Sequence, residues 1–129
     1  MLLKRETEYA IRGLIALARF DGEFCDIGAL AREEKLPSLL LSKLFQKLKK
    51  TGLVRPKIGS KGGFCLSRDA DKITLLSIIQ SIQSFSVIDC MEDGEGFCKK
   101  SGCTLRPVIE KINQNLVEQT RVVSLKDLI

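Results

Sequence analysis

A proline between two short amphipathic segments is the feature that most constrains the fold of this chain. After Pro37, apolar residues repeat at i, i+3, i+4 and i+7, which predicts a helix from about Ser38 to Lys50. These residues are Leu41, Leu44, Phe45 and Leu48. Before Pro37, Asp26 is a suitable N-cap for another helix. Two helices joined by such a tight turn form a helix-turn-helix unit.

The flanking segments predict a fold that is mainly α-helical with a small β wing. A first helix is expected from about Arg5 to Arg19. Gly52 stands where a helix C-terminus favours a residue that tolerates positive φ. Residues 53–58 and 64–66 then read as two short strands around the glycine-rich basic tip 59–63. The expected fold is therefore a winged helix-turn-helix.

The second half of the chain predicts two further helices. Thr74 is expected to cap a core helix from Leu75 to about Phe85, and a last long helix begins near Thr104. The apolar stripe of that last helix could pack on its own domain or on a second copy of the chain, and a homodimer with this dimerisation helix is favoured. The expected divisions are a DNA-binding domain at 1–85, a cysteine loop at 86–103, and the dimerisation helix and tail at 104–129.

Charge is distributed unevenly and indicates a nucleic-acid partner. Residues 1–68 hold 14 Lys and Arg against 7 Asp and Glu, although the whole chain carries only +5. No acidic residue occurs between Lys35 and Arg68. A basic run alone is often no more than a solvated surface, but this one coincides with the helix-turn-helix pattern. A double-stranded DNA operator is therefore the expected partner.

The helical wheel of residues 38–50 separates the core face from the residues that face outward. The N-terminal residues of such a helix reach base edges, so the candidate base contacts are Ser38, Leu39, Ser42, Lys43 and Gln46. Residues better placed for phosphates are Lys47, Lys49 and Lys50. In the wing, Lys57 and Lys61 are expected to contact the DNA backbone or enter a minor groove.

Three cysteines interleaved with glycines predict a thiolate site in a loop. Cys90, Cys98 and Cys103 have the spacing Cys-x7-Cys-x4-Cys. Soft thiolates suit an iron-sulfur cluster or zinc, and the alternative is three ordinary reduced thiols. Cys25 and Cys65 are instead expected to be small buried hydrophobic residues.

Several function classes are disfavoured by what the sequence lacks. The chain contains no histidine, no nucleotide-binding glycine motif and no nucleophile-base constellation, so neither an enzyme nor a small-molecule substrate is expected. No apolar run approaches the ~20 residues of a membrane span. The expected location is the cytoplasm, with no membrane association.

Taken together, these motifs resemble the Rrf-two-type transcription regulators, which include the iron-sulfur, nitric-oxide and rhizobial iron regulators IscR, NsrR and RirA. The resemblance is carried by Glu8-Tyr9-Ala10-Ile11-Arg12, Leu44-Phe45-Gln46-Lys47-Leu48, Gly52-Leu53-Val54, Gly62-Gly63-Phe64, Ile73-Thr74-Leu75 and the cysteine loop. It implies a homodimer that binds a two-iron or four-iron cluster through the three cysteines of each subunit. It further implies that cluster occupancy, which responds to iron, redox or nitric oxide status, changes the affinity for DNA.

The chain departs from the family pattern at a few positions. Without histidine, the fourth cluster ligand is expected to be a carboxylate or an external ligand. Some family members use an acidic residue from the partner subunit, and Glu8 stands at the matching position. Asp89, Asp93 and Glu95 are alternatives within the loop. The other hypothesis is a regulator without a cluster, which responds through thiol redox chemistry or carries zinc.

Overall fold

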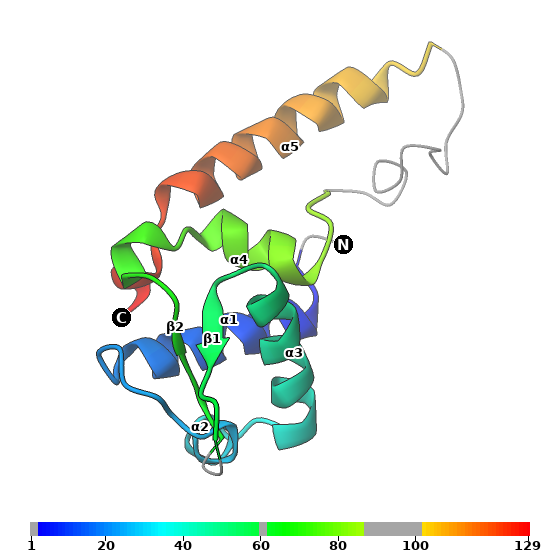
Figure 1. Cartoon of the computed structure of the whole chain (residues 1–129). Coiled ribbons are helices and arrows are strands. Elements are labelled where there is room, and N and C mark those ends of the chain that lie inside the picture. Colours follow the sequence, from blue (N-terminus) through cyan, green and yellow to red (C-terminus); the bar gives the residue numbers. More distant parts are fainter. Residues whose placement is uncertain (1–2, 60–61, 87–101) are drawn as a thin grey trace.

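Five α-helices, one two-stranded antiparallel sheet and two short 3-10 helices, η1 (Ala70–Lys72) and η3 (Leu125–Leu128), make up the part of the chain that the structure describes. The structure is a computed structural model, and it describes residues 3–59, 62–86 and 102–129. The elements are α1 (Arg5–Ala18), α2 (Ile27–Glu34), α3 (Ser38–Lys50), β1 (Val54–Pro56), β2 (Phe64–Leu66), α4 (Leu75–Ile82) and α5 (Leu105–Val122). As Figure 1 shows, α2, α3 and the sheet lie at one end, and α5 extends over α4 at the other. The predicted class, mainly α with a small wing, is confirmed.

The helix boundaries follow local capping chemistry. The Asp26 carboxylate accepts a hydrogen bond from the Ala29 amide at 3.0 Å, and Thr74 Oγ1 accepts one from the Ser77 amide at 3.1 Å. Each bond satisfies one of the backbone donors left over at a helix start. The third helix has the predicted bounds, and Gly52 after it has φ +79°. These sequence predictions are confirmed.

The fourth helix is shorter than predicted, because its last turn is replaced by a buried polar contact. The helix ends at Ile82 rather than near Phe85, and Gln83 is extended and buried. The side-chain oxygen of Gln83 accepts hydrogen bonds from the Lys4 amide, at 2.9 Å, and from the Thr7 hydroxyl. A buried amide needs such partners. The contact joins the end of α4 to the start of α1 and turns the chain away from the helix axis.

One hydrophobic core connects the first three helices, the sheet and α4. Phe45 lies at its centre, fully buried, with its ring centroid 5.5 Å from that of Phe64 in β2. On the other side, a Cβ atom added to Gly13 of α1 would lie 2.9 Å from the Phe45 ring. Helices α1 and α3 therefore pack closely at this point, which holds α3 and the wing in one fixed arrangement.

The C-terminal tail returns to this core after α5. The Leu125 amide donates to the Ile73 carbonyl, and the Leu75 amide donates to the Val123 carbonyl, both at 2.8 Å. Leu125 is fully buried, whereas α5 has no buried residue. Hydrogen bonds from Ser124 stabilise the Asp127 carboxylate and hold its pKa below the usual value. None of the described helices is both long and apolar enough to cross a membrane.

Substitution of Leu125 tests the contribution of the tail to the core. Leu125→Ala should lower the free energy of unfolding by about 2–5 kcal/mol, because it leaves a cavity among packed side chains. Ile129→Ala is the matched control: Ile129 is 54% exposed, and its truncation should change stability by less than about 0.5 kcal/mol. Urea denaturation followed by circular dichroism measures both. Equal effects of the two substitutions would contradict a core role for the tail.

Candidate nucleic-acid interface and cysteine segment

The exposed face of α3 is the one predicted from the helical wheel. Its four core residues are buried, and the predicted outward residues are all exposed. These exposed residues are Ser38, Leu39, Ser42, Lys43, Gln46, Lys47, Lys49 and Lys50. Because α3 is amphipathic, packing one face against α1 leaves the other free for a ligand.

Four of these residues form a single stripe along α3. Leu39, Ser42, Lys43 and Gln46 stand at i, i+3, i+4 and i+7, so they lie on one face of the helix. The stripe begins at the second residue of α3 and combines an apolar group, a hydroxyl, a cation and an amide. These groups can contact or hydrogen-bond to base edges in the major groove of DNA.

The wing is anchored to the start of α2. Cys25 pairs with Phe64 through two backbone hydrogen bonds of 2.8 and 2.9 Å, and the Lys57 amide donates to the Gly63 carbonyl at 2.9 Å. A Cβ atom on Gly63 would lie 2.9 Å from the Cys25 carbonyl oxygen. Gly63 is therefore needed for this close backbone approach, whatever else the wing does. Lys61 lies outside the described residues.

An aromatic residue that sequence reasoning missed supports the cations of the wing. The Arg55 guanidinium and the Lys57 ammonium lie over the Phe24 ring, 5.5 Å and 5.9 Å from its centroid. Such cation–π contacts restrain long basic side chains while leaving their charge exposed. Nothing in the local sequence connects Phe24 with these two residues so much later in the chain, so only the fold reveals this group.

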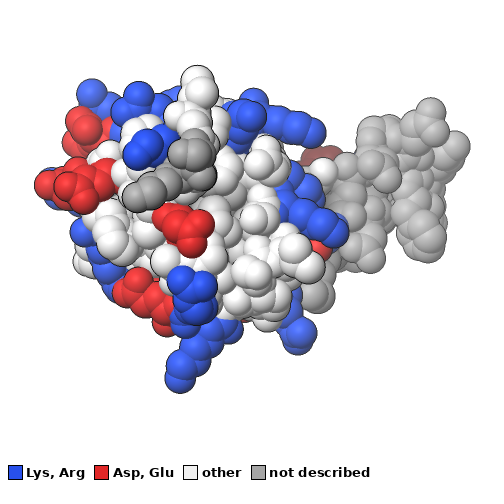
Figure 2. Space-filling view, turned by 60° about the horizontal axis from the view of Figure 1, so that its bottom comes forward, with Lys and Arg blue, Asp and Glu red and all other residues white. Residues whose placement is uncertain are grey.

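Acidic residues partly offset the positive charge near α3. Lys47 Nζ lies 4.0 Å from Glu6 Oε2 of α1, and both side chains are 49% exposed. Exposed pairs of this kind contribute little, so a phosphate can compete for Lys47. In the described part of the chain, Lys43 and Lys50 form no ion pair. Figure 2 looks toward the end that carries α2 and the wing, and there basic side chains stand in separate groups with acidic ones between them.

The structure describes one of the three clustered cysteines. Cys103 is half-buried and lies two residues before α5, whereas Cys90 and Cys98 lie outside the described residues. Glu8 is exposed on α1. Nowhere in residues 3–59, 62–86 and 102–129 do three Cys, Asp or Glu side chains come together to hold a metal ion.

The two remaining cysteines, Cys25 and Cys65, are buried, as predicted. Burial raises the pKa of the Cys25 thiol, and the negative charges of Asp26 and Glu33 raise it further. Cys65 Sγ accepts a hydrogen bond from Arg55 Nε at 3.1 Å. Cys25 therefore stays protonated and packs as a small apolar residue.

Comparison with known proteins identifies the family. Residues 3–129 match the family model described as Rrf2, iron-dependent transcriptional regulator. Over its whole length the chain is 31% identical to protein aau3 of Rhizobium meliloti, covering 85% of that protein. It is 32% identical to the HTH-type transcriptional regulator NsrR of Oceanobacillus iheyensis, again over its whole length and covering 90% of NsrR.

Solved structures show the same fold. IscR of T. potens superposes with a TM-score of 0.78 at 22% identity, over 99% of this chain and 85% of that one. CymR of B. subtilis, the global cysteine regulator, superposes with a TM-score of 0.77 at 22% identity, over 99% and 95% of the two chains. The family is one of transcription regulators rather than enzymes. The chain therefore belongs to the Rrf2 family of transcriptional regulators.

Proposed function

We propose that this regulator binds its operator with an affinity set by an iron-sulfur cluster that senses iron, redox or nitric oxide status. The observation that carries the DNA-binding part is the exposed stripe of α3, held beside a basic wing by one rigid core. The three clustered cysteines and the family membership support the cluster. A regulator of this kind acts on DNA in the cytoplasm as a homodimer.

The DNA interface divides into residues that read bases and residues that hold phosphates. The start of α3 presents Ser38, Leu39, Ser42, Lys43 and Gln46 to base edges in a major groove. Lys47, Lys49 and Lys50 follow in the last turns, where their charges contact the phosphate backbone. Lys57 and Lys61 of the wing contact the adjacent backbone or minor groove. Positioning and readout are thus assigned to different parts of one surface.

Paired substitutions test this division. Lys50→Ala should reduce the slope of log affinity against log salt by about 1, because one phosphate contact is lost, and should weaken binding to all sequences alike. Ser42→Ala should leave the slope unchanged and alter the preference among sites. Mobility-shift titrations over a salt series measure both effects. If the two variants behaved alike, the assignment of Lys50 to phosphate and Ser42 to bases would be wrong.

The homodimer is proposed to form through α5. Several large apolar side chains of this helix are exposed: Leu105 at 56%, Val108 at 55% and Ile112 at 42%. They follow the i, i+3, i+7 spacing of a packing stripe, and a second copy would cover them. A two-fold axis then places two α3 helices on half-sites about one helical turn apart.

Charge substitutions on opposite faces of α5 test the dimer. Ile112→Asp should dissociate the protein to monomers and weaken operator binding, because a carboxylate would be buried in an apolar contact. Gln114→Asp, at an exposed position, adds the same charge about 160° away around the helix and should leave the dimer intact. Sedimentation velocity measures the oligomeric state of each. A dimer that survived Ile112→Asp would place the interface elsewhere.

The donor set fits an iron-sulfur cluster. Three thiolates, from Cys90, Cys98 and Cys103, are soft ligands, and the exposed Glu8 carboxylate of a second copy completes the set. A bound cluster would supply a centre that reacts with oxidants and nitric oxide and that depends on iron supply. Cys103 joins the cysteine segment to the first turn of α5. Ligation of Cys103 would therefore restrain α5, the helix that sets the spacing between the two α3 helices of the dimer.

Anaerobic purification tests the cluster and separates it from the alternative. The protein should be coloured and should contain iron and acid-labile sulfide, and Cys103→Ser should lose most of both. Cys25→Ala, which changes a buried thiol outside the segment, should retain them. Absorbance with iron and sulfide assays provides the measurement. A colourless, iron-free protein that bound its operator fully would rule out cluster control.

The alternative is a regulator that uses thiol redox chemistry or zinc instead of a cluster. It is favoured by the similarity to two CymR structures: that of the global cysteine regulator of B. subtilis, and that of the oxidized form of CymR from Staphylococcus aureus. That structure superposes with a TM-score of 0.76 at 22% identity. DNA binding through α3 and the wing would be the same under both proposals.

A further inference from the structure

Leu39 is an apolar side chain in an exposed polar and basic stripe. It is 80% exposed, although its neighbours on that face of α3 are Ser42, Lys43 and Gln46. Leu40 is partly buried against the core, and Leu41 is fully buried. Of three consecutive leucines, therefore, the first makes no contribution to the core.

Position distinguishes Leu39 from ordinary exposed leucines. A single exposed apolar residue is common on protein surfaces and by itself indicates nothing. Leu39, however, is the second residue of α3, where a recognition helix lies closest to base edges. Ile58 of the wing, at 97%, is the one large apolar residue in the described part of the chain that is more exposed.

We propose that Leu39 recognises the 5-methyl group of a thymine in the major groove. This inference rests on the proposed entry of α3 into that groove. The thymine methyl is the apolar group that the major groove of unmodified DNA presents, and an apolar side chain selects it by removing both surfaces from water. Ser42 and Gln46, one and two turns further along the same stripe, hydrogen-bond to neighbouring base edges. Leu39 thus determines sequence preference without a hydrogen bond.

The test removes the methyl group from DNA and the side chain from the protein independently. The full-length protein, purified anaerobically, first selects an operator from a random duplex pool. Each thymine of the selected site is then replaced in turn by deoxyuridine, which lacks only the methyl group. Affinities are measured for the wild-type protein and for Leu39→Ala, Leu39→Met and Ile58→Ala.

We expect that the loss of affinity on replacing thymine by deoxyuridine depends on the residue at position 39. For the wild type, a single deoxyuridine at the contacted position of one half-site should weaken binding about fourfold, the effect of one methyl group returned to water. The Leu39→Ala variant should bind the thymine and deoxyuridine duplexes with equal affinity. The Leu39→Met variant should again bind the thymine duplex more tightly. Ile58→Ala should keep the difference whatever its overall affinity, because the minor groove displays no thymine methyl.

Two results would overturn the inference while leaving DNA recognition intact. One is a wild-type protein that selects a motif but tolerates deoxyuridine at every position. The other is a Leu39→Ala variant that loses as much affinity on deoxyuridine substitution as the wild type does. That result would assign the methyl contact to another residue, and Leu39 to a different partner. Failure to enrich any motif would instead overturn the proposed sequence-specific function, and with it this inference.

Discussion

The burial of Phe45 between α1 and β2 is the contact on which the proposed DNA-binding surface depends. Its ring touches the surface of α1 at Gly13, where a side chain would not fit, and stacks at a tilt against Phe64. Because this side of α3 faces inward, the helix must present its opposite side to solvent. Which residues of α3 are exposed, Leu39 and the lysines among them, follows from that one packing arrangement. Core residues that cannot themselves contact DNA thus determine which α3 residues are accessible to it.

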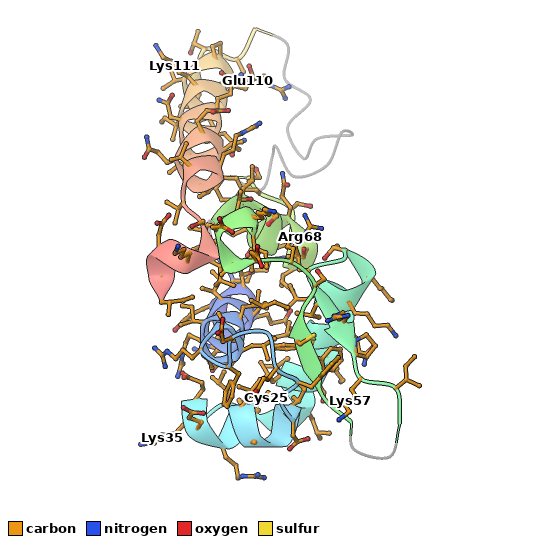
Figure 3. The ribbon with its side chains drawn as sticks, turned by 60° about the vertical axis from the view of Figure 1, so that its left-hand side comes forward. Cys25, Lys35, Lys57, Arg68, Glu110 and Lys111 are labelled. Atoms are coloured by element: carbon orange, nitrogen blue, oxygen red, sulfur yellow. The ribbon has the colours of Figure 1, made fainter. Side chains whose placement is uncertain are left out.

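The wing belongs to the same rigid unit. Backbone pairing of Cys25 with Phe64 joins the start of α2 to β2, and Phe24 lies under Arg55 and Lys57. Figure 3 shows Lys57 and Cys25 toward one end of the molecule, with Glu110 and Lys111 of α5 toward the other end. Helix α3 and the wing therefore have a fixed spacing, which the proposed contact of both elements with one duplex requires. The buried Cys25, whose pKa is raised by burial, belongs to this scaffold.

The two ends of α5 differ in how they are held. At its C-terminal end, Val123 and Leu125 are hydrogen-bonded to Leu75 and Ile73, so this end is fixed to the core that also holds α3. At its N-terminal end, Cys103 leads into the cysteine segment. Helix α5 thus links the cysteine segment to the hydrophobic core. The proposed cluster control requires two states of the proposed dimer that differ in DNA affinity.

The local structure and the amphipathic faces can be predicted from the sequence alone. Apolar periodicity predicted α3 and its exposed residues, and the caps Asp26 and Thr74 predicted two helix starts, because these signals act within one or two turns of chain. Contacts between residues that are distant in the sequence become apparent only in the folded chain. Gln83 ends α4 early because it is hydrogen-bonded to Lys4 and Thr7, which are distant from it in the sequence. Leu125 joins the core, and Phe24 meets Arg55, through folding that brings separate segments together. Local patterns carry no information about such contacts, since their energy comes from packing between elements.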